Sequence, residues 1–284
     1  MSGDRSANLR LGLIGDPVAH SISPALQNAG LAALGLPPGY ALWPTPATEL
    51  EARIASLRAP DVLGANVTVP HKLAVMAYLD EVTPLARRAG AVNTIVHRDG
   101  RLLGDNTDVP GFAAGLAETG LDVASRAALI LGAGGAARAV ALALDGLGME
   151  GITIANRTPE RARALRDALA PLPLRLIQSD PNALSGVLSR IALLVNATAA
   201  GWHRGEAPFP LSLLDLLPRH ALVVDLTYRD TDLLAAARGR GLATLDGLPM
   251  LIHQGARALE LWTGQPAPLS AMREAALSAR TARA

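Results

Sequence analysis

Short apolar runs alternate with longer amphipathic segments along the first hundred residues of this chain. The runs are four to eight residues long, which is typical of strands, whereas the amphipathic segments have helical spacing. Residues 91–106 have the pattern of a β-hairpin that turns at Asp99-Gly100. Strands are predicted at 9–15, 40–45 and 64–69, and helices at 23–35, at 48–59 and from Pro70 toward Tyr78.

A second series of the same kind follows residue 108, and this alternation is typical of βαβ units with a mostly parallel sheet. The order predicts two α/β domains joined near residues 105–110, with the last helices packing back on the first domain. We therefore predict one domain of residues 1–107 plus 248–284 and a second of residues 108–247. The second series has helices at 110–120 and 249–284, a strand, turn and helix at 126–148, and strands at 151–156, 191–198 and 221–228.

Composition narrows the class of protein. Half of the 284 residues are hydrophobic and the formal net charge is +1, so a nucleic-acid partner is not expected. Cysteine is absent, which excludes disulfides, thiolate metal sites and cysteine nucleophiles, and no metal is expected. The first residues, MSGDRSAN, lack the apolar core of a signal peptide, and no apolar run has membrane-spanning length. We expect a cytoplasmic protein with no membrane partner.

The segment Gly132-Ala133-Gly134-Gly135-Ala136-Ala137 matches the G-x-G-x-x-A pattern, directly after the strand ALIL and before a long helix. In such a turn the first glycine permits the tight bend and the second lets the backbone approach a pyrophosphate. The start of the following helix offers free N–H groups to phosphates. A glycine turn without a ligand is the alternative. The placement between strand and helix favours dinucleotide binding.

The second strand of this unit ends in Asn156, where an NAD site usually carries an acidic residue on the ribose. Arg157 follows, and Arg161 lies in the first turn of a helix that Thr158-Pro159 is expected to start, with Thr158 as N-cap. Because a guanidinium pairs well with a 2′-phosphate, the pair predicts NADP rather than NAD. The alternative is a solvated helix face, to which we assign the arginines within 163–166.

Several predicted strand ends in the first domain are unusually polar, and ligands of open α/β sheets bind at such ends. Each side chain also has an ordinary explanation: Ser23 as an N-cap, Asn and Asp as turn formers, Lys72 as a surface cation. Together they predict a pocket for a small ligand with many hydroxyls. The residues are Ser21, Ser23, Asn66, Thr68, Lys72, Asn93, Thr94, Asp105, Asn106, Thr107 and Asp108.

The motifs HSISP, NVTVPHK, AGAVNT, DNTD, GAGGAARA, NRT, NAT and DGLPML…Q occur in this order between Leu11 and Trp262. In this set the chain resembles the NADP-dependent shikimate dehydrogenases of the aroE type. The resemblance implies an N-terminal substrate domain with a mixed, mostly parallel sheet, a C-terminal Rossmann-like NADP domain and a cleft between them. It also implies reversible NADPH-dependent reduction of 3-dehydroshikimate to shikimate in aromatic amino-acid biosynthesis, by a monomer or homodimer.

The resemblance assigns roles residue by residue. Lys72 and Asp108 would be the catalytic pair, and an unperturbed lysine has a pKa near 10.4, so a role as base requires tuning. The substrate residues implied are Ser21 and Ser23 for a carboxylate, then Asn66, Thr68, Lys72, Asn93, Asp108, Tyr228 and Gln254. The cofactor residues implied are Gly132, Ala133, Gly134, Gly135, Ala136, Asn156, Arg157, Thr158, Arg161, Asn196, Ala197, Thr198, Leu226, Gly247 and Met250.

Three positions depart from the family's commonest pattern. Ala199-Ala200 stands where serine often follows NAT, which could weaken cofactor contacts, while Val109-Pro110 and Pro249 could stiffen the connection between the domains. Which member of the Lys72–Asp108 pair carries the proton stays open. Two other functions also stay open: an NAD-preferring quinate/shikimate dehydrogenase, against which the arginine pair argues, and a non-catalytic sensor of shikimate-like acids, which would be expected to lose Lys72 or Asp108. A folate-linked dehydrogenase would share the architecture but lacks these motifs.

Overall fold

The computed structural model describes residues 9–203 and 205–282, and these form two compact units. The first unit is Met1–Gly111 with Leu251–Ala284, and the second is Phe112–Met250. Two helices, α4 (Asp108–Ala117) and α9 (Leu248–Thr263), contribute residues to both units. Each unit contains its own six-stranded sheet, so the predicted class of two α/β halves is confirmed. The domain limits after residues 107 and 247 stay a prediction.

The first unit follows the predicted alternation of strands and helices closely. Its strands are β1 (Arg10–Gly15), β2 (Tyr40–Pro44), β3 (Val62–Val67), β4 (Glu81–Val82), β5 (Thr94–Arg98) and β6 (Arg101–Asp105). Its helices are α1 (Ser23–Ala33), α2 (Leu50–Ser56), α3 (Pro84–Ala89) and α10 (Leu269–Thr281), with 3₁₀ turns at Ala47–Glu49 and Ala74–Tyr78.

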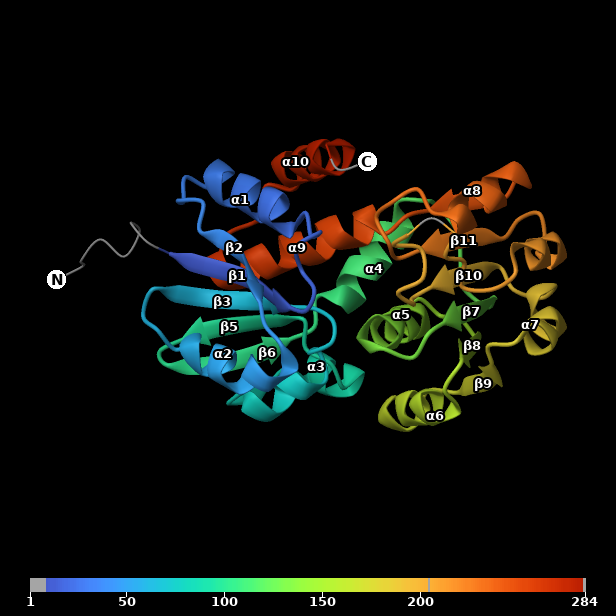
Figure 1. Ribbon diagram of the computed structural model, residues 1–284, viewed down its shortest axis with the longest axis horizontal. Coiled ribbons are helices and arrows are strands. Elements are labelled where there is room, and N and C mark those ends of the chain that lie inside the picture. Colours follow the sequence, from blue (N-terminus) through green and yellow to red (C-terminus); the bar gives the residue numbers. More distant parts are fainter. Residues whose placement is uncertain (1–8, 204, 283–284) are drawn as a thin grey trace. The chain divides into compact units, whose positions relative to one another are not determined.

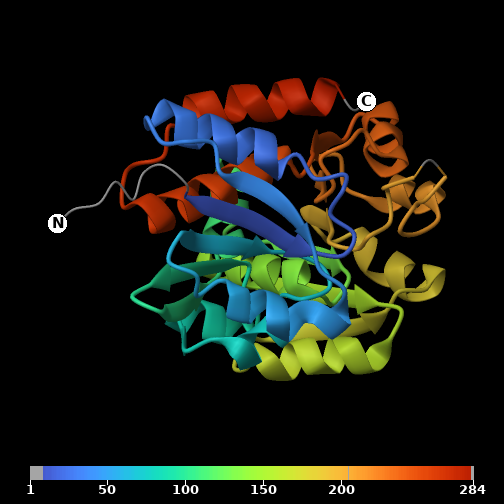
Figure 2. The same ribbon diagram turned by 60° about the vertical axis from the view of Figure 1, so that its left-hand side comes forward.

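The sheet of the first unit has the order β2-β1-β3-β5-β6-β4 and is mixed, because β5 runs antiparallel to both of its neighbours. Figure 1 shows α1 on one side of this sheet and α2 with α3 on the other. Helix α10 lies beside α1 in both views (Figures 1 and 2). A Cβ on Gly30 would lie 2.6 Å from Leu259 Cδ2 and 3.1 Å from Met272 Cγ, so the last helices do pack on the first unit.

The second unit is a regular alternation that begins after α4. Its strands are β7 (Ala127–Leu131), β8 (Gly151–Asn156), β9 (Leu174–Gln178), β10 (Leu193–Asn196), β11 (Leu222–Asp225) and β12 (Ala243–Leu245). Its helices are α5 (Gly135–Gly146), α6 (Pro159–Ala168), α7 (Pro181–Leu188) and α8 (Asp232–Gly239), with a 3₁₀ turn at Leu211–Leu216.

All strand pairs of the second sheet are parallel, in the order β12-β11-β10-β7-β8-β9. This is the doubly wound order, in which the first strand, β7, lies in the middle of the sheet. Strands β8 and β9 are added on one side of β7 and strands β10 to β12 on the other, so the strand order reverses between β7 and β10. Helices α5 and α6 cover one face, while α7 and α8 cover the other (Figure 1). The core on the second face contains Leu184, Leu188 and Leu233. The arrangement is the predicted Rossmann-like fold.

One predicted helix is wrong. Residues 70–73 form turns, and only Ala74–Tyr78 is helical, as a 3₁₀ turn. Tertiary hydrogen bonds account for the difference: the Lys72 carbonyl accepts from the Val92 N–H at 2.7 Å, and the buried His71 Nε2 lies 2.6 Å from the Thr45 carbonyl. These contacts hold residues 71 and 72 against other segments of the first unit, in a turn conformation. The strand predicted at 64–69 is observed as β3, which spans Val62–Val67.

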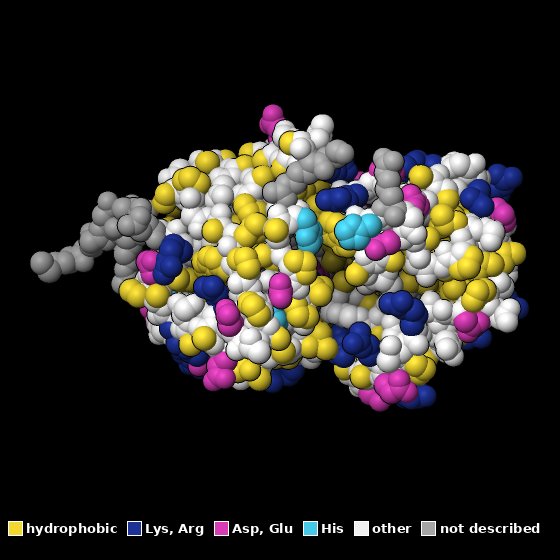
Figure 3. All heavy atoms as spheres, viewed as in Figure 1, with side chains coloured by type: hydrophobic (Ala, Val, Ile, Leu, Met, Phe, Trp, Pro, Cys, Tyr) yellow, Lys and Arg dark blue, Asp and Glu magenta, His cyan; other side chains and the backbone are white. Residues whose placement is uncertain are grey.

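The distribution of charge on the surface and the lengths of the helices are relevant to charged partners and to membranes. Lysine, arginine and acidic side chains are interspersed over the face that Figure 3 shows. Among the described residues, no helix combines the length and the apolar character needed to cross a membrane.

Two helix starts in the second unit give a stability prediction. The Asp180 carboxylate accepts the N–H groups of Asn182 and Ala183 at the start of α7, both at 3.0 Å, whereas Thr158 at the start of α6 makes no side-chain cap bond. Asp180→Ala should lower the free energy of unfolding by about 1 kcal/mol. Thr158→Ala should change it much less. Urea denaturation of the ligand-free protein measures both, and equal losses would contradict the assignment.

Candidate active site

The first unit brings Lys72 and Asp108 into contact. Lys72 Nζ lies 2.6 Å from Asp108 Oδ2, and the exposed fractions of the two side chains are 14% and 6%. Lys72 lies in the turn after β3, and Asp108 is the first residue of α4, where the helix dipole favours a carboxylate. A nearly buried ion pair of this kind is much better shielded from water and salt than the exposed pairs of the same unit.

Hydrogen bonds fix the orientation of the Asp108 carboxylate. Its Oδ1 accepts from Asn93 Nδ2 at 2.9 Å, while its Oδ2 accepts from Lys72. Asn93 is itself oriented by the Thr107 backbone N–H, which donates to Asn93 Oδ1 at 2.7 Å. Each carboxylate oxygen therefore has a defined donor. Thr107 was noted in the sequence only as one of several polar residues, yet it holds the asparagine that holds the aspartate.

Gln254 joins this network from α9, far away in the sequence. Its Oε1 accepts from Asn93 Nδ2 at 3.3 Å, and its Nε2 donates to the Leu251 carbonyl at 2.8 Å. A primary amide has two N–H groups on its nitrogen, so the Leu251 bond leaves one of them for another acceptor. Gln254 is 8% exposed, which places this amide at the edge of the buried network.

Asn66 is held by groups that sequence reasoning missed. The buried Tyr40 hydroxyl donates to Asn66 Oδ1 at 2.8 Å, and Asn66 Nδ2 donates to the Asn93 carbonyl at 3.2 Å and to Thr94 Oγ1 at 3.1 Å. Both amide hydrogens are thus used within the protein. Burial raises the pKa of the Tyr40 phenol, so this donor stays protonated. Nothing in the run YALWPT distinguishes Tyr40 from an ordinary buried strand residue.

Ser21 and Ser23 lie together, as their spacing suggests. Ser21 Oγ donates to Ser23 Oγ at 3.0 Å and accepts from the Ser23 backbone N–H at 3.2 Å, and both side chains are buried. The alternative of Ser23 as an N-cap is not observed, because α1 begins at Ser23 itself and the cap position is Ile22. Thr68, one residue beyond the end of β3, is partly exposed.

The glycine turn of the second unit has the geometry that a dinucleotide requires. Gly132 has φ +108, and a Cβ there would lie 2.9 Å from the Ala197 carbonyl oxygen, so no other residue fits. At Gly134, the cap residue of α5, a Cβ would point into open space with no atom within 4 Å. A pyrophosphate can therefore approach the backbone at Gly134 and the free N–H groups of α5. The residues present fit the cofactor.

The arginines after β8 divide into two kinds. Arg163 pairs with Glu160 at 3.2 Å and Arg166 with Asp167 at 3.0 Å, as expected of a solvated face. Arg157 and Arg161 are exposed, and neither forms an ion pair with a residue in the part of the chain that the structure describes. Exposed guanidiniums beside a helix N-terminus are suited to bind an anion.

The ends of β10 and β11 carry the remaining predicted cofactor residues. Asn196 ends β10 and is fully buried, and the Leu226 N–H donates to its carbonyl at 3.0 Å. The Gly247 N–H donates to the Thr227 carbonyl at 2.9 Å. The Tyr228 ring meets Trp202 edge to face, with 5.3 Å between the ring centroids. Met250 closes the second unit and is partly buried.

Three family models match this chain in succession: the shikimate dehydrogenase substrate binding domain at residues 13–95, shikimate / quinate 5-dehydrogenase at 115–207, and the shikimate 5′-dehydrogenase C-terminal domain at 247–277. A protein of Symbiobacterium thermophilum named shikimate dehydrogenase (NADP(+)) is 49% identical over 98% of this chain and 97% of its own. The chain belongs to the shikimate dehydrogenase family. The resemblance drawn from the motifs is confirmed.

Solved structures of the shikimate dehydrogenase family agree. The enzyme from Thermus thermophilus, in complex with NADP(H) and shikimate, superposes with a TM-score of 0.85 at 43% identity, covering 95% of this chain and 99% of that one. The quinate dehydrogenase of Corynebacterium glutamicum in complex with NAD has a TM-score of 0.86 at 34% identity, covering 95% and 99%. The fold is therefore shared by members that differ in substrate and cofactor.

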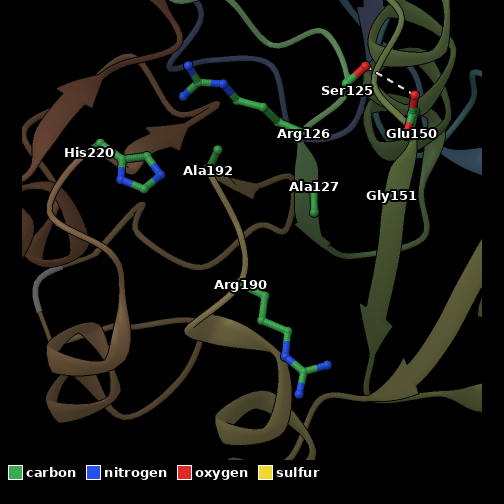
Figure 4. Close-up of a pocket in the computed structure, with 8 residues that line it drawn as sticks. All are labelled: Ser125, Arg126, Ala127, Glu150, Gly151, Arg190, Ala192 and His220. Carbon is green, nitrogen blue, oxygen red and sulfur yellow. Dashed lines mark hydrogen bonds between the residues drawn. The ribbon is translucent and has the colours of Figure 1, made fainter.

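A pocket of about 700 Å³ lies at the opposite edge of the second sheet from the glycine turn. Figure 4 shows Arg126 and Arg190 extending in different directions, and the Ser125 hydroxyl donating to Glu150 Oε1 at 3.1 Å. This edge receives the carboxyl ends of helices such as α7, which ends at Leu188. That end of a helix carries a partial negative charge, which basic side chains complement. None of the predicted site residues lines this pocket.

The described residues also bear on whether the protein holds a metal ion. Among the described residues, no three or more histidine or acidic side chains are placed to hold a metal ion.

The buried phenol of Tyr40 allows a clean test of the network. Tyr40→Phe removes only the hydroxyl and leaves Asn66 Oδ1 without its donor, so the free energy of unfolding should fall by about 1–3 kcal/mol. Tyr78→Phe is the matched control, because that side chain is 36% exposed. Urea denaturation of both variants measures the difference. A Tyr40→Phe loss no larger than that of the control would show that the hydrogen bond contributes nothing.

Proposed function

We propose that this chain catalyses the reversible NADPH-dependent reduction of 3-dehydroshikimate to shikimate, as an oxidoreductase acting on a CH–OH group. The observation that carries the proposal is the shielded Lys72–Asp108 pair among neutral hydrogen-bonding groups, in the unit that the substrate-binding family model matches. The relatives' names support it, since several are called shikimate dehydrogenase (NADP(+)).

In the reduction, NADPH supplies the hydride when it is bound. Lys72 and Asp108 supply the proton that the ketone oxygen then requires. Lys72 Nζ is the donor that polarises this oxygen, and the 2.6 Å contact with Asp108 lets a proton pass within the pair. Asn93 keeps the acceptor oxygen of Asp108 directed at the lysine.

The neutral groups of the first unit bind the ring. Ser21 already donates to Ser23, so the Ser23 hydroxyl hydrogen is directed outward and can meet the substrate carboxylate. The second N–H of Gln254 and the Thr68 hydroxyl face ring hydroxyls. Asn93 and Asn66 form side-chain hydrogen bonds with other residues of the protein and thereby orient their neighbours. Tyr228 is the substrate residue that the second unit contributes.

The second unit holds NADP. The turn Gly132-Ala133-Gly134-Gly135 and the start of α5 bind the pyrophosphate, and Arg157 with Arg161 binds the 2′-phosphate, with Asn156 and Thr158 shaping the turn between them. Asn156 Nδ2 donates to the Thr158 carbonyl at 2.8 Å, which supports this arrangement. An NAD-preferring quinate/shikimate dehydrogenase is the second candidate. The exposed arginine pair, which has no acidic partner among the described residues, favours the first.

Removing either member of the catalytic pair should abolish most turnover while binding persists. For Lys72→Ala and Asp108→Ala we expect kcat to fall about 10²–10⁴-fold, because general acid–base help is lost. Shikimate oxidation with NADP, followed spectrophotometrically at saturating substrate, measures it. Asp61→Ala, which breaks an exposed ion pair with Arg10, is the control and should keep full activity. Near-normal turnover would remove that residue from the mechanism.

Neutralising the arginine pair should separate the two cofactors. Each charge-assisted contact contributes roughly 1.5–3 kcal/mol, so Arg157→Gln with Arg161→Gln should weaken NADP binding at least tens-fold and leave NAD nearly unchanged. Arg163→Gln, which loses only its bond to Glu160, is the matched control. Calorimetric titration with each nucleotide measures the affinities. Equal losses for both would assign the arginines to the fold, and an NAD preference in the unmodified chain would favour the second candidate.

A further inference from the structure

Asp225 is a buried carboxylate that the proposed reaction does not use. It ends β11 beside Asn196, the last residue of β10, and the two are register partners in the parallel sheet. Both are 0% exposed. Within the described residues no cationic side chain pairs with Asp225, so N–H and O–H donors alone balance its charge. These are Asn196 Nδ2 at 3.1 Å, the Thr227 N–H at 3.1 Å and Oγ1 at 2.9 Å, and Thr231 Oγ1 at 2.9 Å.

Burying such a group is costly. Burial raises the pKa of Asp225, and the hydrogen bonds of Thr227, Thr231 and Asn196 act in the opposite direction. A carboxylate without a cation in the interior loses several kcal/mol of hydration that donors only partly replace. Placed at the carboxyl edge of the sheet, where the ligands of this fold bind, such a costly group calls for a functional explanation.

Asn196 transmits the position of Asp225 to the following loop. Besides its bond to Asp225, Asn196 Nδ2 donates to the Ala200 carbonyl at 3.0 Å, and Asn196 Oδ1 accepts from the Thr198 N–H at 3.1 Å and from its Oγ1 at 2.7 Å. The side-chain amide therefore ties both ends of the loop 197–200. Both of its N–H groups are used, so Asn196 has no donor left for a cofactor.

The loop in turn lies against the glycine turn. The Ala197 N–H donates to the Leu131 carbonyl at 2.9 Å, and the Ala197 carbonyl oxygen is the atom that leaves no room for a Cβ on Gly132. On the other side, Thr227 is held by Asp225 and accepts from the Gly247 N–H. One carboxylate thus connects four segments: the glycine turn, the loop 197–200, Thr227 and Gly247.

We propose that Asp225 is a positioning residue for the dinucleotide: through Asn196 and Thr227 it sets the shape of the loops around the glycine turn without touching the cofactor. This inference rests on the proposed function for the identity of the cofactor. It also explains why Ala199-Ala200 is compatible with the site, since the loop uses only backbone atoms of Ala200, which any residue supplies.

The test is calorimetric titration of the whole chain with NADP and, separately, with NAD. Asp225→Ala should weaken both nucleotides by a similar factor, roughly tenfold or more, because the glycine turn and its loops contact the part that the two share. Asp225→Asn should stay within about threefold of the unmodified chain, since an amide can keep the oxygen acceptor and let Thr231 accept instead. Shikimate affinity should change much less than nucleotide affinity in both variants, because all of the proposed substrate residues except Tyr228 lie in the first unit.

Two further variants separate positioning from stability. Leu184→Ala removes a buried core side chain of α7 in the same unit and should lower the unfolding temperature without changing nucleotide affinity. If Asp225→Ala fails to fold, Asn196→Ala carries the test with the same expected loss for both nucleotides. Unchanged affinity in Asp225→Ala or its substitute Asn196→Ala, losses matched by Leu184→Ala, or Asp225→Asn as weak as Asp225→Ala would each overturn the inference. Failure of the unmodified chain to bind NADP would instead overturn the proposed function.

Discussion

The ion pair of Lys72 and Asp108 is the interaction on which the first unit's polar interior depends. Removing one partner would leave an uncompensated charge in a nearly buried place, which costs about 3–5 kcal/mol. The surrounding groups are arranged to avoid that cost: Asn93 satisfies the second carboxylate oxygen, and Thr107 satisfies Asn93. The same arrangement brings Lys72 Nζ within 2.6 Å of Asp108 Oδ2, and to this pair we assign the proposed acid–base role.

Asparagine side chains connect neighbouring segments by hydrogen bonds in both units. Asn66 and Asn196 each end or nearly end a strand at the carboxyl edge of a sheet, and each uses its side-chain N–H groups on protein acceptors. An asparagine at a strand end can bind three or four partners at once, which lets it join loops that lie far apart in sequence. Such residues are found beside ligands because they shape the site. Contact with the ligand is not required for that.

The second unit combines two electrostatic requirements at one edge. The glycine turn, the start of α5 and the pair of Arg157 and Arg161 favour anions, whereas Asp225 is itself an anion at the same edge. The two are compatible because Asp225 is fully buried among hydrogen-bond donors, whereas Arg157 and Arg161 are exposed. The charged and polar groups that we propose to bind the dinucleotide here are therefore the arginines and the backbone N–H groups.

The sequence alone determined the class of fold, the order of most strands and helices and the glycine turn, while the pairing of Lys72 with Asp108 came from the resemblance of its motifs to a known family. These follow from local periodicity, from turn chemistry and from motifs that are contiguous in the chain. It did not determine the turns at 70–73, where hydrogen bonds to Val92 and Thr45 replace the predicted helix. Nor did it single out Tyr40, Thr107 or Asp225, because a buried polar residue has no local signature, and each of these has a partner at least 14 residues away. Only the tertiary structure decides which donors meet which acceptors, since a change of a few tenths of an ångström in the donor–acceptor distance makes or breaks a hydrogen bond, and no sequence pattern encodes that precision.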